Sequence, residues 1–238
     1  MPSILFTTPM AIISSKENSK GKSYFAFFDL DRTLIRETSG TALVRGALRK
    51  NLLSLGDISK ALLLSFEYKS GLYNPLSIIN KMTTWVKGLP EKVMDDLASE
   101  VCEKVLLPSV FKSGRDEIGY HHDRNAGTVI LSSSLTPVCL RVRDYLGIDD
   151  VICSDLEVVN GVYTGRSNGP LCFGAEKANQ LRIFCEINDC SPEKSWYYGD
   201  SESDIPVMEV VGHPNCINPD RRLRKMAARK AWKVNYWE

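Results

Sequence analysis

Short apolar runs alternate with amphipathic helical patterns along most of the chain. The apolar runs are typical of strands that are buried on both faces of a sheet. They cover residues 24–29, 128–131, 150–153, 195–198 and 215–217. Apolar positions at helical spacing lie between them, over residues 136–146, 176–187, 203–210 and 220–228. This alternation predicts an α/β fold with a doubly wound parallel sheet, whose ligands bind beyond the carboxyl ends of the strands.

The segment between the first two predicted strands has a different pattern. Residues 38–111 contain helical spacings, such as Leu62, Leu63 and Phe66, and no convincing strand. They therefore predict a helical cap domain inserted after the first strand. The core domain then consists of residues 23–37 and 112–238. A β-hairpin is predicted over residues 157–165, where β-branched residues flank an Asn-Gly pair.

The first 22 residues are predicted to form a flexible N-terminal extension. They begin with a mildly apolar stretch that lacks a basic leader, and they continue with Ser, Lys and Gly. This pattern does not match a secretory signal peptide.

Composition limits the partners of the chain. Its 30 basic and 29 acidic residues give a net charge of +1, which provides no general attraction to nucleic acid. No apolar run is long enough for a membrane helix, so no stable membrane insertion is expected. The seven cysteines include no C-x-x-C pair, and most lie in apolar runs. We interpret them as free thiols and expect a cytoplasmic protein. The sequence makes no prediction of oligomeric state.

Candidate chemistry begins at the end of the first predicted strand, with Asp29, Asp31 and Thr33. Two carboxylates this close raise each other's pKa unless a cation lies between them. Mg²⁺ prefers oxygen ligands and would relieve the repulsion. One carboxylate would remain as a nucleophile and the other as a proton carrier. An isolated motif of this kind is more often a capped turn, so it needs support from elsewhere in the chain.

Three further signals follow later strands or begin a helix. Gly199 to Asp204 form a second acidic turn, in which Asp200 and Asp204 could complete a Mg²⁺ site. Ser132 ends a predicted strand, where its hydroxyl could bind a phosphoryl oxygen. Lys177 lies near the start of a predicted helix and could balance the negative charge. Each also has a structural interpretation, as a turn, a helix start or a solvent-facing lysine.

Together, in this order, the motifs resemble those of the haloacid dehalogenase (HAD) superfamily. They are D-x-D-x-T at Asp29, the strand-end Ser132, Lys177, and G-D-S-x-x-D from Gly199. The closest similarity is to the phosphoserine-phosphatase-like branch, subfamily IB, whose members have a helical cap after the first motif. Asn218-Pro219-Asp220 also resembles that branch.

The resemblance implies a Mg²⁺-dependent phosphohydrolase that works through an aspartyl-phosphate. Asp29 would be the nucleophile, and Asp31 would protonate the leaving group and then activate water. The implied metal ligands are Asp29, Asp31 through its main-chain carbonyl, and Asp200, with Asp204 as a ligand or a support. The implied phosphate-binding residues are Thr33, Ser132, Ser133 and Lys177.

The expected substrate is a small phosphomonoester other than phosphoserine. The family contacts the substrate amine through a Glu after the first motif, and Glu37 is offset by one residue from that position. It also uses a cap Arg for the substrate carboxylate, and residues 56–114 contain no Arg.

Two other functions remain as alternatives. One is a phosphorelay receiver domain, in which the phosphorylated Asp follows a later strand and no large insertion is present. The other is a catalytically silent HAD module with a binding or regulatory role.

Overall fold

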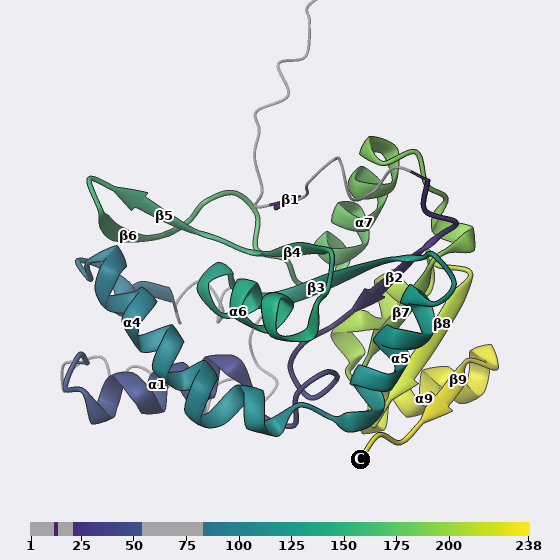
Figure 1. Cartoon of the computed structure of the whole chain (residues 1–238), viewed down its shortest axis with the longest axis horizontal. Helices are drawn as coiled ribbons and strands as arrows, with labels where there is room; N and C mark the ends of the chain where they lie inside the picture. The colour runs from purple at the N-terminus through teal and green to yellow at the C-terminus, as the bar shows by residue number, and fades with distance from the viewer. Residues whose placement is uncertain (1–11, 14–20, 54–82) are drawn as a thin grey trace, which may run out of the picture.

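Seven strands form one sheet in the order β1-β4-β3-β2-β7-β8-β9 (Figure 1). The computed structural model describes residues 12–13, 21–53 and 83–238. The strands are β1 (Ile12–Ile13), β2 (Phe25–Phe28), β3 (Gly127–Leu135), β4 (Asp150–Ser154), β7 (Trp196–Gly199), β8 (His213–Ile217) and β9 (Lys233–Asn235). All neighbours pair in parallel except β1, which runs antiparallel to β4. The predicted parallel sheet is confirmed.

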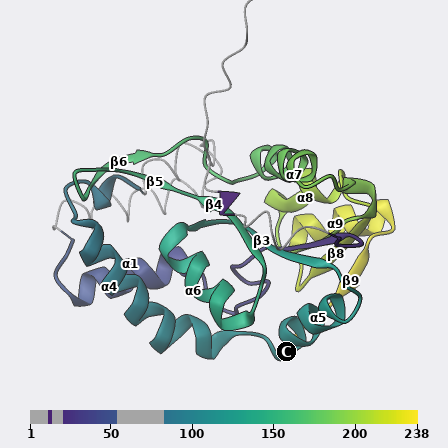
Figure 2. The same ribbon diagram turned by 45° about the horizontal axis from the view of Figure 1, so that its top comes forward.

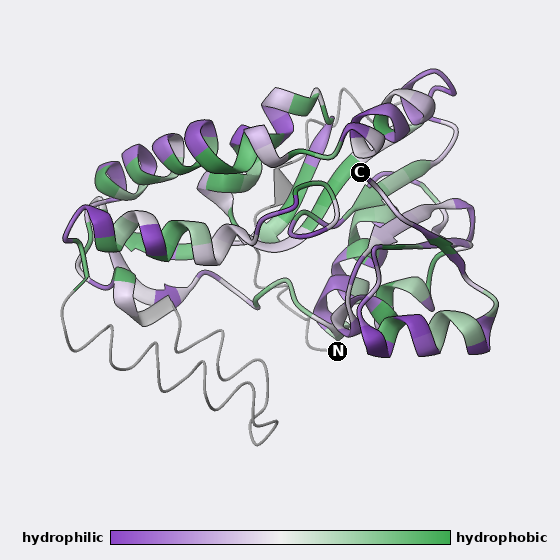
Figure 3. Cartoon of the chain, turned by 90° about the horizontal axis from the view of Figure 1, so that it is seen from below, coloured by the Kyte–Doolittle hydropathy of each residue, from purple (hydrophilic) through white to green (hydrophobic). Residues whose placement is uncertain are grey.

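Helices cover both faces of this sheet (Figure 2). Helices α5 (Lys112–His122) and α6 (Thr136–Leu146) lie on one face, and α7 (Ala175–Ile187), α8 (Ile205–Met208) and α9 (Arg221–Lys230) lie on the other. The side chains of β2 alternate between the two cores. Phe25 and Phe27 pack with Phe184 of α7, whereas Ala26 and Phe28 belong to the core that contains Ile118 of α5. Figure 3 shows the hydrophobic strands enclosed by helices whose outer sides are hydrophilic.

The elements described between β2 and β3 are all helical. Before α5 of the core, they are α1 (Ser39–Arg49), the 3-10 turn η1 (Thr83–Val86), α4 (Glu91–Val101), the π-helical turn η2 (Cys102–Leu106) and the 3-10 turn η3 (Leu107–Ser109). The predicted helix around Leu62 to Phe66 lies outside the described residues. Helix α4 packs on α6 of the core, where Arg141 forms a 2.7 Å ion pair with Asp95. The helical insertion after the first strand is therefore confirmed, while its boundaries, 38–111, stay a prediction.

The predicted hairpin forms from β5 (Leu156–Val159) and β6 (Val162–Ser167). Asn160 and Gly161 both have positive φ, at 52° and 74°, as the tight turn between twisted strands requires. The hairpin also bonds to the helical insertion, since the Glu91 N–H donates to the Gly161 carbonyl at 2.8 Å. The core thus holds the insertion through this hairpin as well as through α6.

Several elements differ from the sequence predictions. Two residues of the predicted N-terminal extension, Ile12 and Ile13, pair with β4 as the edge strand β1. Residues 203–210 do not form one helix, because a capping box between Ser201 and Asp204 closes a 3-10 turn before α8 begins. The pattern also missed β9 and α5. The buried residues of α5 are Gly114, Ile118 and His121, so its buried stripe contains a single aliphatic side chain.

The state of the cysteines agrees with the sequence analysis. All seven cysteines are free thiols, and six of them are buried. In the described part of the chain, no helix has both the length and the apolar character needed to cross a membrane.

Candidate active site

Three carboxylates meet where β2 and β7 end. Asp29 directly follows β2, and Asp200 directly follows β7. Because these strands are parallel neighbours, their carboxyl ends lie at the same edge of the sheet. One carboxylate oxygen from each of Asp29, Asp200 and Asp204 lies within 4.8 Å of the others, and all three residues are buried. The structure therefore brings Asp29 together with two acids that lie 171 or more positions further along the chain.

Lys177 is the cation buried among these acids. It lies in the first turn of α7, and its side chain is 2% exposed. Its Nζ donates to Oδ1 of Asp29 at 2.7 Å and to Oδ1 of Asp204 at 2.8 Å. It also lies 3.2 Å from the Tyr197 hydroxyl. Lys177 thus connects the acid after β2 to the acidic turn after β7.

Asp204 has a different environment from the other two acids. Its Oδ1 accepts hydrogen bonds from Lys177 and, at 2.6 Å, from the Tyr197 hydroxyl, and its Oδ2 accepts from the Ser201 N–H and hydroxyl. Gly199 permits this arrangement, because a Cβ there would lie 2.7 Å from Asp204 Oδ2. With four donors around it, Asp204 fits a supporting role, which the sequence analysis had allowed beside that of ligand.

Asp31 is turned away from the carboxylate cluster. Its Oδ1 accepts from the Ser39 N–H and its Oδ2 from the Ser39 hydroxyl, both at 2.9 Å. The same hydroxyl lies 2.7 Å from the hydroxyl of Ser134. Ser39 is the first residue of α1, so the beginning of the helical insertion holds this carboxyl group. The Asp31 side chain has no place in the cluster that could bind a metal ion.

The sequence analysis did not identify Ser39, Ser134 or Tyr197. The period of a strand places Ser132 and Ser134 on the same face, which is a signal that could have pointed to Ser134. Tyr197 lies in a strand that was interpreted as apolar core, and its hydroxyl gives no signal in the pattern. The contact of Ser39 depends on where the insertion packs.

The predicted phosphate-binding hydroxyls have three different environments. Ser132 is fully buried within β3, and its hydroxyl lies 3.3 Å from that of Ser134. The hydroxyl of Thr33 is buried and has no hydrogen-bond partner within the described structure. Ser133 is partly exposed. Strand β3 runs through all three serines and loses its register with β4 there, so they do not follow the strand as predicted.

The electrostatics of the cluster favour a bound cation. Burial raises the pKa of Asp29 to about 7. Attraction by Lys177 opposes this rise, and repulsion by Asp204 adds to it. Burial and the charge of Asp29 raise the pKa of Asp200 to about 8. For Asp204, the effect of burial is outweighed by Lys177 and by its hydrogen bonds, which hold its pKa below the usual range. One buried lysine therefore does not neutralise the cluster.

The cluster fits Mg²⁺ in its donor atoms and its charge. Asp29 and Asp200 offer carboxylate oxygens, the ligands that Mg²⁺ prefers. The nearest cation to Asp200 is Arg32, whose Nε lies 3.7 Å from Oδ2 on a side chain that is 63% exposed. Arg32 can move into solvent, and the uncompensated charge of the two acids then provides a site for a divalent ion.

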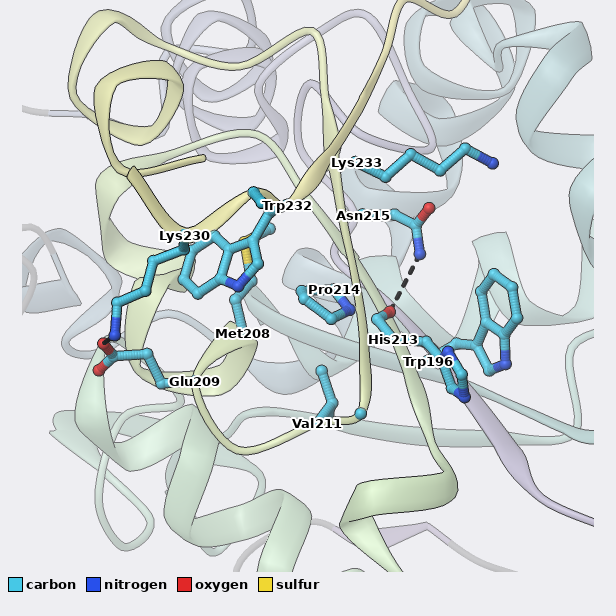
Figure 4. A pocket seen from close by; sticks show the side chains of 12 residues that line it. Trp196, Met208, Glu209, Val211, His213, Pro214, Asn215, Lys230, Trp232 and Lys233 are labelled. Carbon is cyan, nitrogen blue, oxygen red and sulfur yellow. Dashed lines mark hydrogen bonds and ion pairs between the residues drawn. The ribbon is translucent and has the colours of Figure 1, made fainter. Parts of the chain in front are cut away.

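A separate cavity of about 460 Å³ lies at the other end of the strands (Figure 4). It is lined by Trp196, His213 and Lys233, which begin β7, β8 and β9. Trp196 and His213 stack there, with ring centroids 4.6 Å apart. None of the carboxylates described above lines this cavity. The chemistry is therefore assigned to the acidic cluster and not to this cavity.

The profile of the haloacid dehalogenase-like hydrolases matches residues 26–209, which span the sheet and the acidic cluster. The chain therefore belongs to the haloacid dehalogenase-like hydrolases and is an enzyme of their phosphatase class, similar to phosphoserine phosphatases.

Several relatives carry phosphatase names. A probable phosphatase of Mycobacterium tuberculosis is 28% identical over 212 residues, which cover 88% of this chain and 74% of the relative. A phosphoserine phosphatase of the same species is 24% identical, and the match covers 88% of this chain and 69% of the relative. A histidinol-phosphatase of Neisseria meningitidis is 26% identical, with 88% of this chain and 96% of the relative covered.

A solved structure has the same fold. A protein of unknown function from Bordetella pertussis superimposes with a TM-score of 0.80 at 23% identity. The match covers 90% of this chain and 98% of the other. The chain therefore shares its fold over nearly the whole length of that protein.

Proposed function

We propose that the protein is a Mg²⁺-dependent phosphohydrolase of a small phosphomonoester, and that it works through a phosphoryl group carried on Asp29. The observation that carries this proposal is that two acids close together in sequence have different hydrogen-bond partners. Asp29 is paired with a buried lysine and lies in the carboxylate cluster, whereas Asp31 is held apart by Ser39. This difference supports Asp29 as the nucleophile and Asp31 as the proton carrier.

In the first step, an oxygen of Asp29 attacks phosphorus and the ester bond to the leaving group breaks. Lys177 keeps Asp29 ionised and oriented, because its ammonium group bonds to one oxygen of that carboxylate. Asp31 gives its proton to the departing oxygen. Burial raises the pKa of Asp31, which favours the protonated form that this step requires.

In the second step, Asp31 takes a proton from water, and the resulting hydroxide displaces Asp29 from phosphorus. The Ser39 hydroxyl can donate to an ionised carboxylate or accept from a protonated one. It can therefore hold Asp31 in both states. A Mg²⁺ ion on Asp29 and Asp200, with the main-chain carbonyl of Asp31, would offset the negative charge of the phosphoryl oxygens. Thr33, Ser132 and Lys177 are the proposed donors to those oxygens, and Ser133 is a further candidate.

The helical insertion is proposed to act as a cap that selects the substrate. Its first helix already contacts the proton carrier through Ser39. Closing such a domain over a phosphoester excludes water and completes the site. The relatives are named for phosphoserine and histidinol phosphate, which are both small phosphomonoesters. We propose the same substrate class here, with no nucleic-acid partner.

Metal removal tests this function against the silent module. Turnover of an aryl phosphate is expected to disappear in excess chelator, because the buried acids would repel both each other and the substrate. Adding Mg²⁺ back should restore it, which can be followed by the release of inorganic phosphate. Full activity in chelator would contradict the metal assignment. A protein that turns over no ester from a broad phosphometabolite panel with Mg²⁺ would support a silent module.

Replacing Ser39 with Ala tests whether the insertion positions Asp31. We expect kcat to fall by roughly 10-fold, about the effect of losing one hydrogen bond to a charged group. The Ser39 N–H still holds one oxygen of Asp31, so activity should not vanish. The loss should be smaller for esters with good leaving groups, which need less protonation. Ser39→Thr should recover part of kcat.

The matched control for this variant is Ser99→Ala, which removes an exposed hydroxyl on α4 that donates to the side chain of Glu103. It should leave kcat unchanged. An equal loss in Ser39→Ala and Ser99→Ala, or a loss that does not depend on the leaving group, would show that Ser39 has only a structural role.

A further inference from the structure

Helix α7 ends in a turn that brings two cysteines together. The helix stops at Ile187, and Asp189 adopts a left-handed conformation with φ of 52°. The N–H of Cys190 then donates to the carbonyl of Cys185 at 2.9 Å. This bond is the mark of a Schellman turn, in which the side chains at these two positions contact each other. The contact is usually apolar, and here both positions are thiols.

The two thiols affect each other's ionisation. The neighbouring Cys190 thiol lowers the pKa of the Cys185 thiol, against the opposing effect of burial. Cys185 and burial together raise the pKa of the Cys190 thiol. Cys185 is almost fully buried, whereas Cys190 is partly exposed. One sulfur is thus accessible from outside, and the other is the better thiolate.

A cavity gives access to this pair. Cys185 and Cys190 both line a hollow of about 540 Å³ at the end of α7. In a second pair, burial and Cys153 raise the pKa of the Cys139 thiol, but both residues are at most 1% exposed. The chain therefore contains one thiol pair with an opening and a second pair without one.

We propose that Cys185 and Cys190 are a redox-active dithiol, which forms a reversible disulfide by exchange with a small neutral or cationic disulfide. The Cys190 sulfur reacts first because it is the more exposed one of the pair. It attacks R–S–S–R, forms a mixed disulfide and releases one R–SH, which takes the Cys190 proton. The Cys185 sulfur then attacks the Cys190 sulfur, and the second R–SH leaves with the Cys185 proton. The protein dithiol is oxidised by two electrons, and the small disulfide is reduced to two thiols.

The charge of the cavity selects the type of disulfide. Its lining includes four carboxylates and one guanidinium, Arg182. The carboxylates belong to Glu186, Asp189, Glu193 and Glu209. An anionic disulfide such as oxidised glutathione is repelled by this lining, while cystamine, which is cationic, is attracted.

The test uses the wild-type chain and one tryptic peptide. Trypsin cuts after Arg182 and Lys194, so residues 183–194 carry both cysteines. The protein is equilibrated with a series of cystamine and cysteamine mixtures, quenched, denatured and alkylated. We expect this peptide to lose two hydrogen atoms in mass and to lose both alkyl labels as the mixture becomes oxidising, and to recover them on reduction. Cys139 and Cys153 should stay alkylated throughout.

Two variants establish the order of the steps. Cys185→Ser should keep cysteamine bound to Cys190 as a mixed disulfide, because the resolving sulfur is missing. Cys190→Ser should take up none at Cys185. The exchange should be faster with cystamine than with oxidised glutathione, and this difference should shrink at high salt.

Three results would overturn the proposal. The first is a wild-type peptide alkylated at both cysteines in every mixture. The second is oxidation of the buried Cys139 and Cys153 to the same extent as Cys185 and Cys190. The third is a faster reaction with oxidised glutathione than with cystamine, which would exclude the acidic cavity as the route of entry.

Discussion

Replacing Asp29 with Asn is expected to reduce turnover by roughly 10⁴-fold or more, as the loss of a nucleophile does in enzymes with covalent intermediates. The amide has no ionised oxygen to attack phosphorus. The fold should survive, because Lys177 keeps its ion pair with Asp204 at 2.8 Å and the change relieves repulsion within the acidic cluster. Steady-state kinetics with an aryl phosphate, together with thermal unfolding, measure the two effects separately.

The matched control is Asp144→Asn, which neutralises a carboxyl group that is 65% exposed on α6. It should leave kcat unchanged. If Asp29→Asn kept a tenth or more of the wild-type kcat, Asp29 would not be the nucleophile. If the variant unfolded, Asp29→Glu, which keeps the charge but moves the reacting oxygen, would provide the same test.

Replacing Asp200 with Asn should abolish stabilisation by Mg²⁺ and yet make the metal-free protein more stable. The pKa of Asp200 is raised from 3.8 to about 8, mainly by burial and by Asp29. A carboxyl pKa above its unfolded value means that the folded state loses stability as the pH rises from about 4 towards 8. The amide of Asp200→Asn does not ionise, so the variant does not lose this stability as the pH rises. Without metal, we expect Tm at pH 8 to rise by at least about 2–4 °C, the effect of roughly 1 kcal/mol in a chain of this size.

The comparison variant is Asp204→Asn, for which the opposite sign is expected. Asp204 accepts hydrogen bonds from Lys177, Tyr197 and Ser201, so its removal should lower Tm with or without Mg²⁺. Thermal unfolding at several pH values, with Mg²⁺ and with chelator, measures all three proteins. A wild-type response to Mg²⁺ in Asp200→Asn, or a lower Tm without metal, would show that Asp200 is only a turn residue.

The alternation of apolar strands and helical patterns was sufficient to predict the parallel sheet. A buried strand of a parallel sheet is apolar on both faces, so runs such as residues 24–29 are distinctive. A polar residue that directly follows such a strand can also be placed at the carboxyl edge of the sheet. Asp29 and Asp200 could therefore be assigned to one edge before any contact between them was known.

Contacts that depend on packing between distant elements could not be predicted in the same way. Ser39 begins the helical insertion, and nothing in its neighbourhood along the chain shows that it reaches Asp31. Tyr197 is apolar by pattern, yet its hydroxyl donates to Asp204 in the buried site. The division of roles between Asp200 and Asp204 was also open, because spacing alone does not show which acid is already surrounded by donors.

The proposed mechanism requires that Asp29 carries a phosphoryl group, and Asp31→Asn tests this directly. The variant keeps the nucleophile but has no group to activate water, a role worth roughly 10²–10⁴-fold. An activated aryl phosphate needs little protonation to leave, so it should still phosphorylate the protein.

Tryptic digestion after a rapid acid quench releases residues 23–32, which contain Asp29 and the substituted position. We expect this peptide to carry a phosphoryl group on Asp29 in Asp31→Asn, which hydroxylamine removes, and the peptide of Asp29→Asn to carry none. A phosphoryl group on Asp31 in Asp29→Asn, or an unmodified peptide in Asp31→Asn during active turnover, would contradict the proposed mechanism.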